Sequence, residues 1–284
     1  MATRSARSVV LRPMSTADVE AATELSREQA WPHREDDWQL FLTAGEGLVA
    51  EQDGRVIGTV MAWRYGHDFA SLGMVIVANK AQGQGIGRRL MEAMLGRLDG
   101  RSVLLNATEQ GLPLYAKLGF TAIGTIHQHH ADVPAMPLAE LLPGERVRPA
   151  GRADDWLGQL YSRASGTDRQ ALLRLLSSES KTVALTRDDV PVGFAQVRRF
   201  GRGRLVGPVV APDPHGARTL ILHWLAAHSG KFCRLDVTGE SGLSGWLEEL
   251  GMPLVGTVTT MVRGVRPQPD PAAQVHAIPA QALG

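Results

Sequence analysis

The stretch from Met74 to Leu98 constrains the fold more than any other part of this sequence. It opens with an apolar run, Met74–Ala78, that is short enough for a buried strand. A loop with glycine at every second position follows, at Gly83, Gly85 and Gly87. Apolar residues then recur at helical spacing, at Leu90, Met91, Met94, Leu95 and Leu98. The chain must therefore fold around a strand, a glycine loop and a helix in direct succession.

This arrangement predicts an anion site. Glycine has no Cβ, so a ligand can approach the main chain closely, and the following helix points its unpaired N–H groups and positive dipole end at the loop. A phosphate suits such a site best. The loop lacks the Lys-Ser/Thr ending of a nucleotide triphosphate loop, and its G-x-G-x-G spacing differs from the dinucleotide pattern G-x-G-x-x-G. On these residues alone, a tight turn without a ligand stays open.

At this loop the sequence resembles a known family. Gln82-x-x-Gly85-x-Gly87, between a buried strand and a helix, is similar to the acyl-CoA pyrophosphate loop of the GNAT superfamily of N-acetyltransferases. The loop of that family has Gln or Arg, two residues, Gly, one residue, and Gly or Ala. A second family signature, Leu114–Phe120, lies one strand further on. The resemblance covers residues 9–128 and continues more faintly through the remainder.

The resemblance implies which residues bind acyl-CoA. Main-chain groups of the strand would hydrogen-bond the pantetheine arm, loop amides would hold the pyrophosphate, and Arg88 would add a charge-assisted contact. The implied residues are Val75, Ile76, Val77, Gln82, Gly83, Gln84, Gly85, Ile86, Gly87, Arg88 and Asn106. Tyr115 matches the general acid of the family, because a phenol pKa of about 10 suits a leaving thiol of about 8.5. Packing for Tyr115, and a turn or cap role for Asn106, are the open alternatives.

The usual base of the family, a Glu on the strand that enters the loop, is missing here. The corresponding residues, Ser71–Val75, contain no carboxylate. A water wire is one substitute, and His67, Asp68 and Glu109 are candidates by position alone. Candidate walls of the acceptor pocket, each also explained by ordinary packing, are Trp31, His33, Trp63, Arg64 and Tyr65.

The first half of the chain predicts the order β-α-α-β-β-β-α-β-α-β, which matches the GNAT fold. Val9–Arg12 has the pattern of a first strand, and helices are expected from Ala17 and from Asp36. Two further strands flank Asp53-Gly54, a pair that supplies the positive φ values of a type I′ turn. We therefore expect an α/β fold with a mixed sheet.

The second half repeats the first at an offset of about 130 to 136 residues. Four patterns recur in the same order, at Arg12–Pro13 and Arg148–Pro149, Val56–Gly58 and Pro191–Gly193, Gly73–Ile76 and Gly207–Val210, and Leu118–Phe120 and Leu250–Met252. We therefore expect two tandem GNAT-like acyl-CoA N-acyltransferase domains. The predicted division is a flexible N-terminus at 1–8, a catalytic domain at 9–132, a linker at 133–147, a degenerate domain at 148–265 and a disordered tail at 266–284.

The second copy has lost the glycine cradle. Its equivalent segment, Pro212–Ala217, is about three residues shorter, and its two prolines remove main-chain donors. Asp213 places a negative charge where a pyrophosphate would lie. No tyrosine matches Tyr115, since Trp246–Leu250 takes that place. Only the first copy is therefore expected to bind CoA, with the second packed over its acceptor cleft.

Composition argues against several other classes of function. A formal net charge of +1 over 284 residues gives no electrostatic reason to expect nucleic acid or an anionic membrane. No apolar run is long enough to span a membrane, and residues 1–8 lack the apolar segment of a secretory signal. The single cysteine, Cys233, cannot form an internal disulfide, which favours a cytoplasmic protein.

Histidines at positions 127, 129 and 130, with Asp132, have the residue types of a metal site. On an extended strand His127 and His129 face one side, while His130 begins the linker. A polar seam between the domains is therefore expected here, and no metal.

The sequence predicts an acetyl-CoA-dependent N-acetyltransferase that acts directly on a primary amine, most simply of a small molecule. Acetyl-CoA is then a cosubstrate, no nucleic acid or membrane is expected as a partner, and a homodimer stays open. Two alternatives remain: a non-catalytic acyl-CoA sensor or regulatory protein, and a protein acetyltransferase with an open acceptor groove. The residues do not specify the acceptor amine.

Overall fold

Both halves of the chain follow the predicted order of elements. The computed structural model describes residues 8–151 and 154–284, so the flexible N-terminus expected at 1–8 lies, apart from Ser8, outside the described residues. The first half contains β1 (Val10–Pro13), α1 (Val19–Glu28), α2 (Glu35–Ala44), β2 (Glu46–Gln52), β3 (Arg55–Tyr65), β4 (Phe69–Val77), α3 (Ile86–Arg97), β5 (Ser102–Ala107), α4 (Leu112–Lys117) and β6 (Thr121–Asp132). The second half contains β7 (Glu145–Pro149), α5 (Asp155–Ser165), α6 (Gln170–Glu179), β8 (Ser180–Arg187), β9 (Val190–Phe200), β10 (Gly203–Ala211), α7 (Pro214–Ala226), β11 (Phe232–Thr238), α8 (Ser244–Glu249) and β12 (Leu254–Arg263). The same order in both halves confirms the internal repeat.

The turn between β2 and β3 is the predicted one. Asp53 and Gly54 have φ values of 51° and 74°, and a type I′ turn requires positive φ at both positions. The strands then pair in antiparallel register, from Gln52 with Arg55 at the turn to Glu46 with Ala62.

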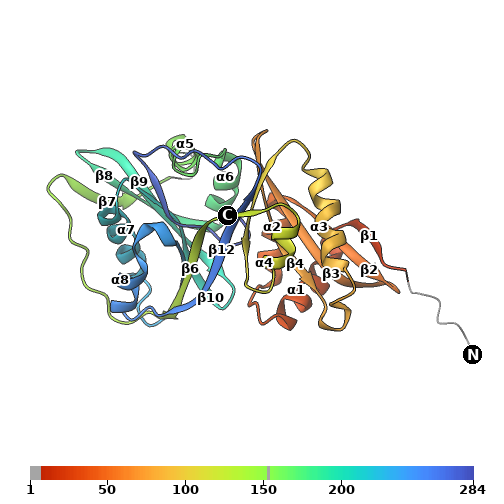
Figure 1. Cartoon of the computed structure of the whole chain (residues 1–284). Helices are drawn as coiled ribbons and strands as arrows, with labels where there is room; N and C mark the ends of the chain where they lie inside the picture. The colour runs from red at the N-terminus through yellow and green to blue at the C-terminus, as the bar shows by residue number, and fades with distance from the viewer. Residues whose placement is uncertain (1–7, 152–153) are drawn as a thin grey trace, which may run out of the picture.

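Within the described residues, all strands belong to one thirteen-stranded sheet, in the order β1-β2-β3-β4-β5-β12-β6-β11-β13-β10-β9-β8-β7. The two copies exchange their last strands: β12 pairs with β5 of the first copy, and β6 pairs with β11 of the second. These two strands also pair with each other and lie between the halves in Figure 1. The predicted boundary at residue 132 is therefore wrong as a division in space. Because β6 and β12 are equivalent strands of the repeat, either can complete either copy. Here β12 completes the first copy and β6 completes the second.

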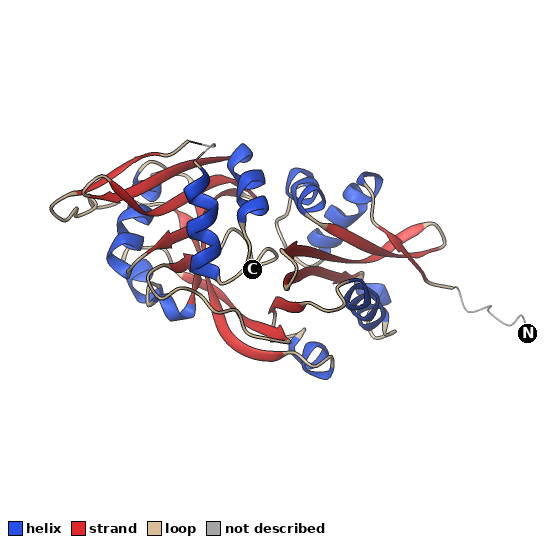
Figure 2. Cartoon of the chain, turned by 90° about the horizontal axis from the view of Figure 1, so that it is seen from above, coloured by secondary structure: helices blue, strands red, loops and turns tan. Residues whose placement is uncertain are grey.

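Helices lie on both sides of the strands in each half (Figure 2). In the first copy α3 packs Leu90, Met91 and Met94 against the sheet. Another core is common to both copies, because Trp38 of α2 belongs to the same buried cluster as Leu176 of α6. The shared strands and this shared core hold the two copies together as one body.

The disordered tail predicted at residues 266–284 is wrong. β13 (Gln274–Ala277) enters the sheet between β10 and β11. Beyond it Ala280 and Leu283 are buried, and the Leu283 carbonyl accepts hydrogen bonds from Tyr65 and Arg169. Proline, alanine and glutamine suggested disorder by composition, yet small alanines fit where elements pack closely and larger side chains would not.

The predicted linker is wrong only at its end. Residues 133–144 contain neither helix nor strand, whereas β7 begins at Glu145 and so includes the last three residues of the predicted linker. None of the described helices has the length and apolarity that crossing a membrane requires.

Candidate active site

The strands β4 and β5 separate partway along their length and leave a groove between them. They pair in parallel only from Phe69 with Ser102 to Ser71 with Leu104. Beyond that point β4 continues to Val77, paired with β3 alone. A cavity of about 390 Å³ lies here, lined by residues of β4, the glycine loop, β5 and α4. The strand before the glycine loop therefore diverges from its neighbour β5.

A bulge in β4 lies along this groove. Between the pairs Thr59–Ile76 and Met61–Gly73 the register shifts, so two residues of β4, Met74 and Val75, oppose one of β3. Met74 has a φ of 51°, and its carbonyl accepts a hydrogen bond from Thr59 Oγ1 at 2.8 Å. A bulge leaves its extra residue out of the ladder. The bulge therefore interrupts the hydrogen-bond ladder between β4 and β3 at Val75. Main-chain groups of Val75 are then available to a ligand in the groove.

The loop after β4 presents open main chain to the groove. Gly83 and Gly85 have φ values of 75° and 76°, a region that residues with a Cβ rarely adopt. A Cβ on either would meet no atom within 4 Å, so both glycines face open space. Gly85 is the N-cap of α3 and supplies no side-chain cap, which leaves the N–H groups of the first turn without a partner in the helix. These donors and the helix dipole both favour an anion.

Every predicted binding residue except Gln84 lines the groove, namely Val75, Ile76, Val77, Gln82, Gly83, Gly85, Ile86, Gly87, Arg88 and Asn106. Gln84 is exposed and turns toward the Lys80 carbonyl instead. Gln82 Nε2 donates to the Val77 carbonyl at 3.1 Å, which ties the loop to the end of the strand. Arg88 is exposed at the helix start, and its Nε lies 2.8 Å from Glu92 Oε1. To contact a ligand, Arg88 would have to break this surface ion pair.

Tyr115 lies in α4 and lines the same groove. Its ring is half-buried and contacts Phe120 edge-on, with ring centroids 6.2 Å apart. Burial raises the pKa of Tyr115 to about 12. The phenol is therefore protonated at neutral pH and can donate a proton to a group in the groove.

Sequence reasoning missed the part of the groove that comes from distant segments. Asn106 Oδ1 accepts a hydrogen bond from Thr260 of β12 at 2.7 Å, and its Nδ2 donates to the Gln281 carbonyl at 2.8 Å. A Cβ on Gly73 would lie 3.1 Å from the Cα of Ala282. The segment after β13 therefore packs against β4 and β5 at the point where they separate. The available signal was the three large apolar residues of this tail, Val275, Ile278 and Leu283.

None of the candidate bases lines the groove. His67 and Asp68 lie in the turn before β4, and the strand separates them from the glycine loop by roughly 25 Å. Glu109 precedes α4 but does not face the groove. The described lining contains no Asp, Glu or His. The structure therefore does not bring His67, Asp68 or Glu109 into the groove, and of the options that the sequence left open the water wire stays a prediction.

Of the candidate acceptor walls, only Trp31 lines the groove. Trp63 and Tyr65 are buried in the core that both copies share. Arg64 is exposed, and His33 lies among the aromatic rings of the same core. Packing therefore explains three of the five residues, and Arg64 is a surface residue that pairs with Glu46.

The histidines at 127, 129 and 130 lie on β6 between β11 and β12, which is the predicted seam between the copies. His129 is fully buried, with Nδ1 2.9 Å from the Met252 carbonyl and Nε2 2.8 Å from Ser244 Oγ. Both ring nitrogens are therefore used to join β6 to the end of the second copy.

Comparisons with known proteins agree with this geometry. Two family models described as "Acetyltransferase (GNAT) domain" match the chain, one over residues 43–122 and the other over residues 158–277. The chain is 28% identical over 241 residues to YitH, an uncharacterized N-acetyltransferase of Bacillus subtilis (strain 168), with 82% of this chain and 84% of that protein covered. It is 24% identical over 288 residues to the holothin acyltransferase of Pseudoalteromonas sp. (strain SANK 73390), with 96% and 94% covered.

The fold also matches a solved structure along its whole length. A putative acetyltransferase from Pyrococcus horikoshii superposes with a TM-score of 0.80 at 19% identity, with 97% of this chain and 96% of that chain covered. The chain belongs to the GNAT acetyltransferase superfamily and carries two GNAT domains in tandem. It is an N-acyltransferase, an enzyme that transfers an acyl group to an amine.

Proposed function

We propose that this enzyme transfers the acetyl group of acetyl-CoA directly to the primary amine of a small molecule. The observation that carries the proposal is one continuous groove that joins the glycine loop, the free edge of β4 and Tyr115. The loop offers a diphosphate its main-chain donors. From the loop, the pantetheine arm would follow the main-chain groups of β4 to the point where β4 and β5 separate. There the thioester would lie close to both the amine and Tyr115.

The chemistry needs few protein groups. The amine nitrogen forms a bond to the acetyl carbon, the carbon–sulfur bond breaks, and the leaving thiolate takes the proton of Tyr115 Oη. The proton of the amine passes to water, and the Tyr115 phenolate is reprotonated from solvent. Holding both reactants in place can supply about 7–11 kcal/mol of the barrier reduction. A positioned acid adds about 10²–10⁴-fold.

The second copy supports a small acceptor. Thr260 of β12 and the carbonyl of Gln281 both hydrogen-bond Asn106 at the inner end of the groove. A protein segment that entered from this side would have to displace them. A free amine of limited size would not, because it could enter the space that these elements leave.

The direct test combines calorimetry with acetyl-CoA and a panel of amines assayed for release of free thiol. Binding of acetyl-CoA and turnover with one class of small amine are expected. Binding without thiol release for any amine would identify an acyl-CoA sensor instead. Faster acetylation of peptides than of free amines would identify a protein acetyltransferase, and absence of acetyl-CoA binding would overturn the proposal.

A further inference from the structure

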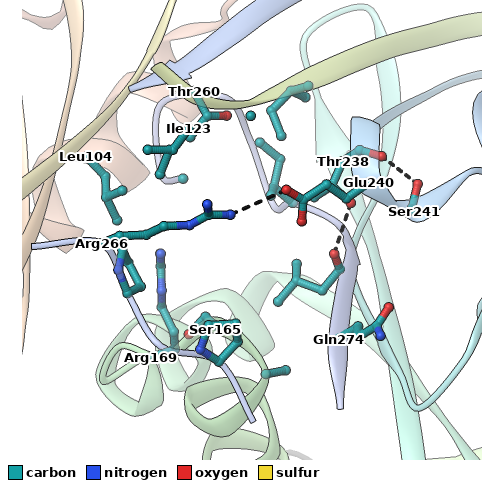
Figure 3. A pocket seen from close by; sticks show the side chains of 18 of the residues that line it. Leu104, Ile123, Ser165, Arg169, Thr238, Glu240, Ser241, Thr260, Arg266 and Gln274 are labelled. Atoms are coloured by element: carbon teal, nitrogen blue, oxygen red, sulfur yellow. Dashed lines mark hydrogen bonds and ion pairs between the residues drawn. The ribbon is translucent and has the colours of Figure 1, made fainter. Parts of the chain in front are cut away.

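A second cavity, here called the interdomain cavity, lies between the copies. It has a volume of about 530 Å³ and is lined by residues of β5, β6, β12, α5 and the segment from Arg266 to Ile278. Leu105 and Asn106 line both this cavity and the groove, so both spaces border the end of β5. Figure 3 shows the interdomain cavity with Leu104 and Ile123 on its wall. The position suits an acceptor whose amine must reach the groove.

Tyr161 of α5 gives this cavity an unsatisfied hydrogen-bond donor. Its side chain is almost completely buried and lines the cavity. None of the described residues forms a hydrogen bond with its Oη. Burial raises the pKa of Tyr161 to about 12, so the hydroxyl stays protonated and can donate. A buried hydroxyl without a partner is costly, which indicates that a ligand supplies the acceptor atom.

Arg169, the residue before α6, gives the same cavity a buried cation. Its Nε donates to Thr167 Oγ1 and its Nη1 to the Leu283 carbonyl, each at 2.7 Å. Its guanidinium carbon lies 3.8 Å from the ring centroid of Tyr65 and 5.6 Å from that of Tyr161. These partners are all neutral, and no acid among the described residues forms an ion pair with Arg169. A buried charge without a counter-charge is unfavourable, so the site favours an anion.

The remaining charges of the lining are balanced. Arg266 extends across the cavity to Glu240, 3.4 Å away, as Figure 3 shows. Asp270 is held from outside the cavity by Arg163 at 2.6 Å. Arg169 is thus the charged side chain of the described lining for which no ion pair forms, beside the unsatisfied hydroxyl of Tyr161. Gly284 lines the cavity next to it, since a Cβ on Gly284 would lie 3.6 Å from Arg169 Nη2. The rest of the wall is mostly apolar.

We propose that the interdomain cavity binds the acceptor by a carboxylate, held by Arg169 and Tyr161, and that the acceptor is therefore an amino acid with an apolar side chain rather than a simple amine. The inference rests on the proposed function, because it names the acceptor of that same reaction. With the carboxylate at α5 and α6, the apolar side chain would lie on the cavity wall. The amine would lie toward Asn106, the residue that borders both the cavity and the groove.

Matched acceptors test this without any mutation. Leucine is compared with isopentylamine, and phenylalanine with phenethylamine, so each pair differs by the carboxylate alone. With saturating acetyl-CoA, kcat/KM from thiol release should be at least about tenfold higher for the amino acids, since charge-assisted hydrogen bonds are the strong ones. Equal or faster turnover of the simple amines would overturn the inference while leaving the proposed function intact.

A binding measurement keeps the inference testable if no amine is turned over. Calorimetry with N-acetyl-leucine and with N-isopentylacetamide probes the interdomain cavity directly, without chemistry. Binding of the first compound alone would support the carboxylate site even though the proposed function had failed. Equal binding of both, or of neither, would overturn it.

Two variants locate the effect. Tyr161→Phe removes a hydroxyl without a partner among the described residues, so the fold should be unaffected while KM for leucine rises about tenfold. The rate with isopentylamine should not change. Arg169→Gln should raise KM for leucine further. It also removes the hydrogen bond to the Leu283 carbonyl, so the folding of this variant must be checked by circular dichroism. Arg174→Gln, on the exposed side of α6, is the matched control and should behave as the unmodified protein. An unchanged KM for leucine in Tyr161→Phe would contradict the site.

Discussion

The two copies have the same order of elements but treat the separation of their parallel strands in opposite ways. In the first copy β4 leaves β5 after Ser71, and the gap remains a groove. In the second copy β10 and β11 pair only from Arg204 with Cys233 to Leu205 with Arg234. β13 then fills the gap by pairing with both strands. In the second copy β13 thus fills the space between the parallel strands, and in the first copy the equivalent space remains open to a ligand.

The helices that follow these strands differ in the same sense. The N-terminus of α7 is capped by Asp213, whose carboxylate accepts from the Gly216 N–H and pairs with Arg187, both at 2.8 Å. The N-terminus of α3 begins after Gly85 and has no side-chain cap. A helix N-terminus can bind an external anion only where the chain has not supplied its own. One fold therefore holds both states: local residues decide whether the helix N-terminus is open, and the distant strand β13 decides whether the gap between the parallel strands is filled.

The largest effect is expected from giving the first copy the charge of the second. Gly85→Glu places a carboxylate at the N-terminus of α3, and acetyl-CoA binding should be lost to calorimetry because adjacent like charges cost several kcal/mol. The positive φ adds strain of about 1–3 kcal/mol. Gly100→Glu is the matched control, since Gly100 also has a positive φ, of 80°, and open space around it. Retained binding in a folded Gly85→Glu protein would contradict the anion site.

The next effect concerns the acid that only the first copy has. Tyr115→Phe should lower kcat by about 10²–10³-fold while acetyl-CoA affinity stays the same, because the hydroxyl donates its proton only as the thiolate leaves. Steady-state thiol release and calorimetry together measure both quantities. Trp246→Phe, at the residue next to Leu247, which is the equivalent of Tyr115 in the second copy, should leave kcat unchanged. If kcat were the same in Tyr115→Phe, the tyrosine would be a packing residue.

The third prediction concerns the stability that the residues after β13 give to the core shared by both copies. Leu283 is completely buried in the shared core. Leu283→Ala should therefore lower the free energy of unfolding by about 2–5 kcal/mol, measured by denaturant titration. Val265→Ala, at a side chain that is 67% exposed, should change it little. Equal stability of both variants would mean that the segment does not pack as the structure shows.

The smallest effect is expected at the cap of α7. Asp213→Ala should cost about 1 kcal/mol of stability, and acetyl-CoA binding to the second copy should not appear, because β13 still fills the gap. Burial favours a higher pKa for Asp213, but the Gly216 N–H and Arg187 outweigh it and lower the pKa. The cap therefore stabilises the fold above about pH 4, and its contribution is lost as the pH falls through the folded value. A gain of acetyl-CoA binding in the variant would show that charge alone had closed this copy.

Local features of the site could be predicted because they depend on short stretches of chain. The spacing of Gly83, Gly85 and Gly87 after a buried strand predicted the open loop, and the helix start placed its donors there. The signature around Tyr115 predicted a phenol beside the same groove. Each of these features depends on residues close together in sequence, so no knowledge of distant contacts was needed.

Features that depend on distant partners could not be predicted. The repeat predicted two copies, but an exchange of β6 and β12 leaves the sequence pattern unchanged, because either strand suits either position. The base candidates failed for a related reason: His67 and Asp68 are near the groove in sequence but lie at the far end of β4. The environment of Asn106 depends on Thr260 and Gln281, which lie more than 150 residues away along the chain.

The sequence by itself determined the fold family, the open helix N-terminus of the first copy and the closed one of the second, because glycine, proline and aspartate act on the main chain within a few residues. Only the tertiary structure decided which strands pair across the copies and where the last residues lie. Strand pairing depends on main-chain hydrogen bonds that all residues except proline can make. The choice among equivalent partners is therefore made by packing over the whole molecule.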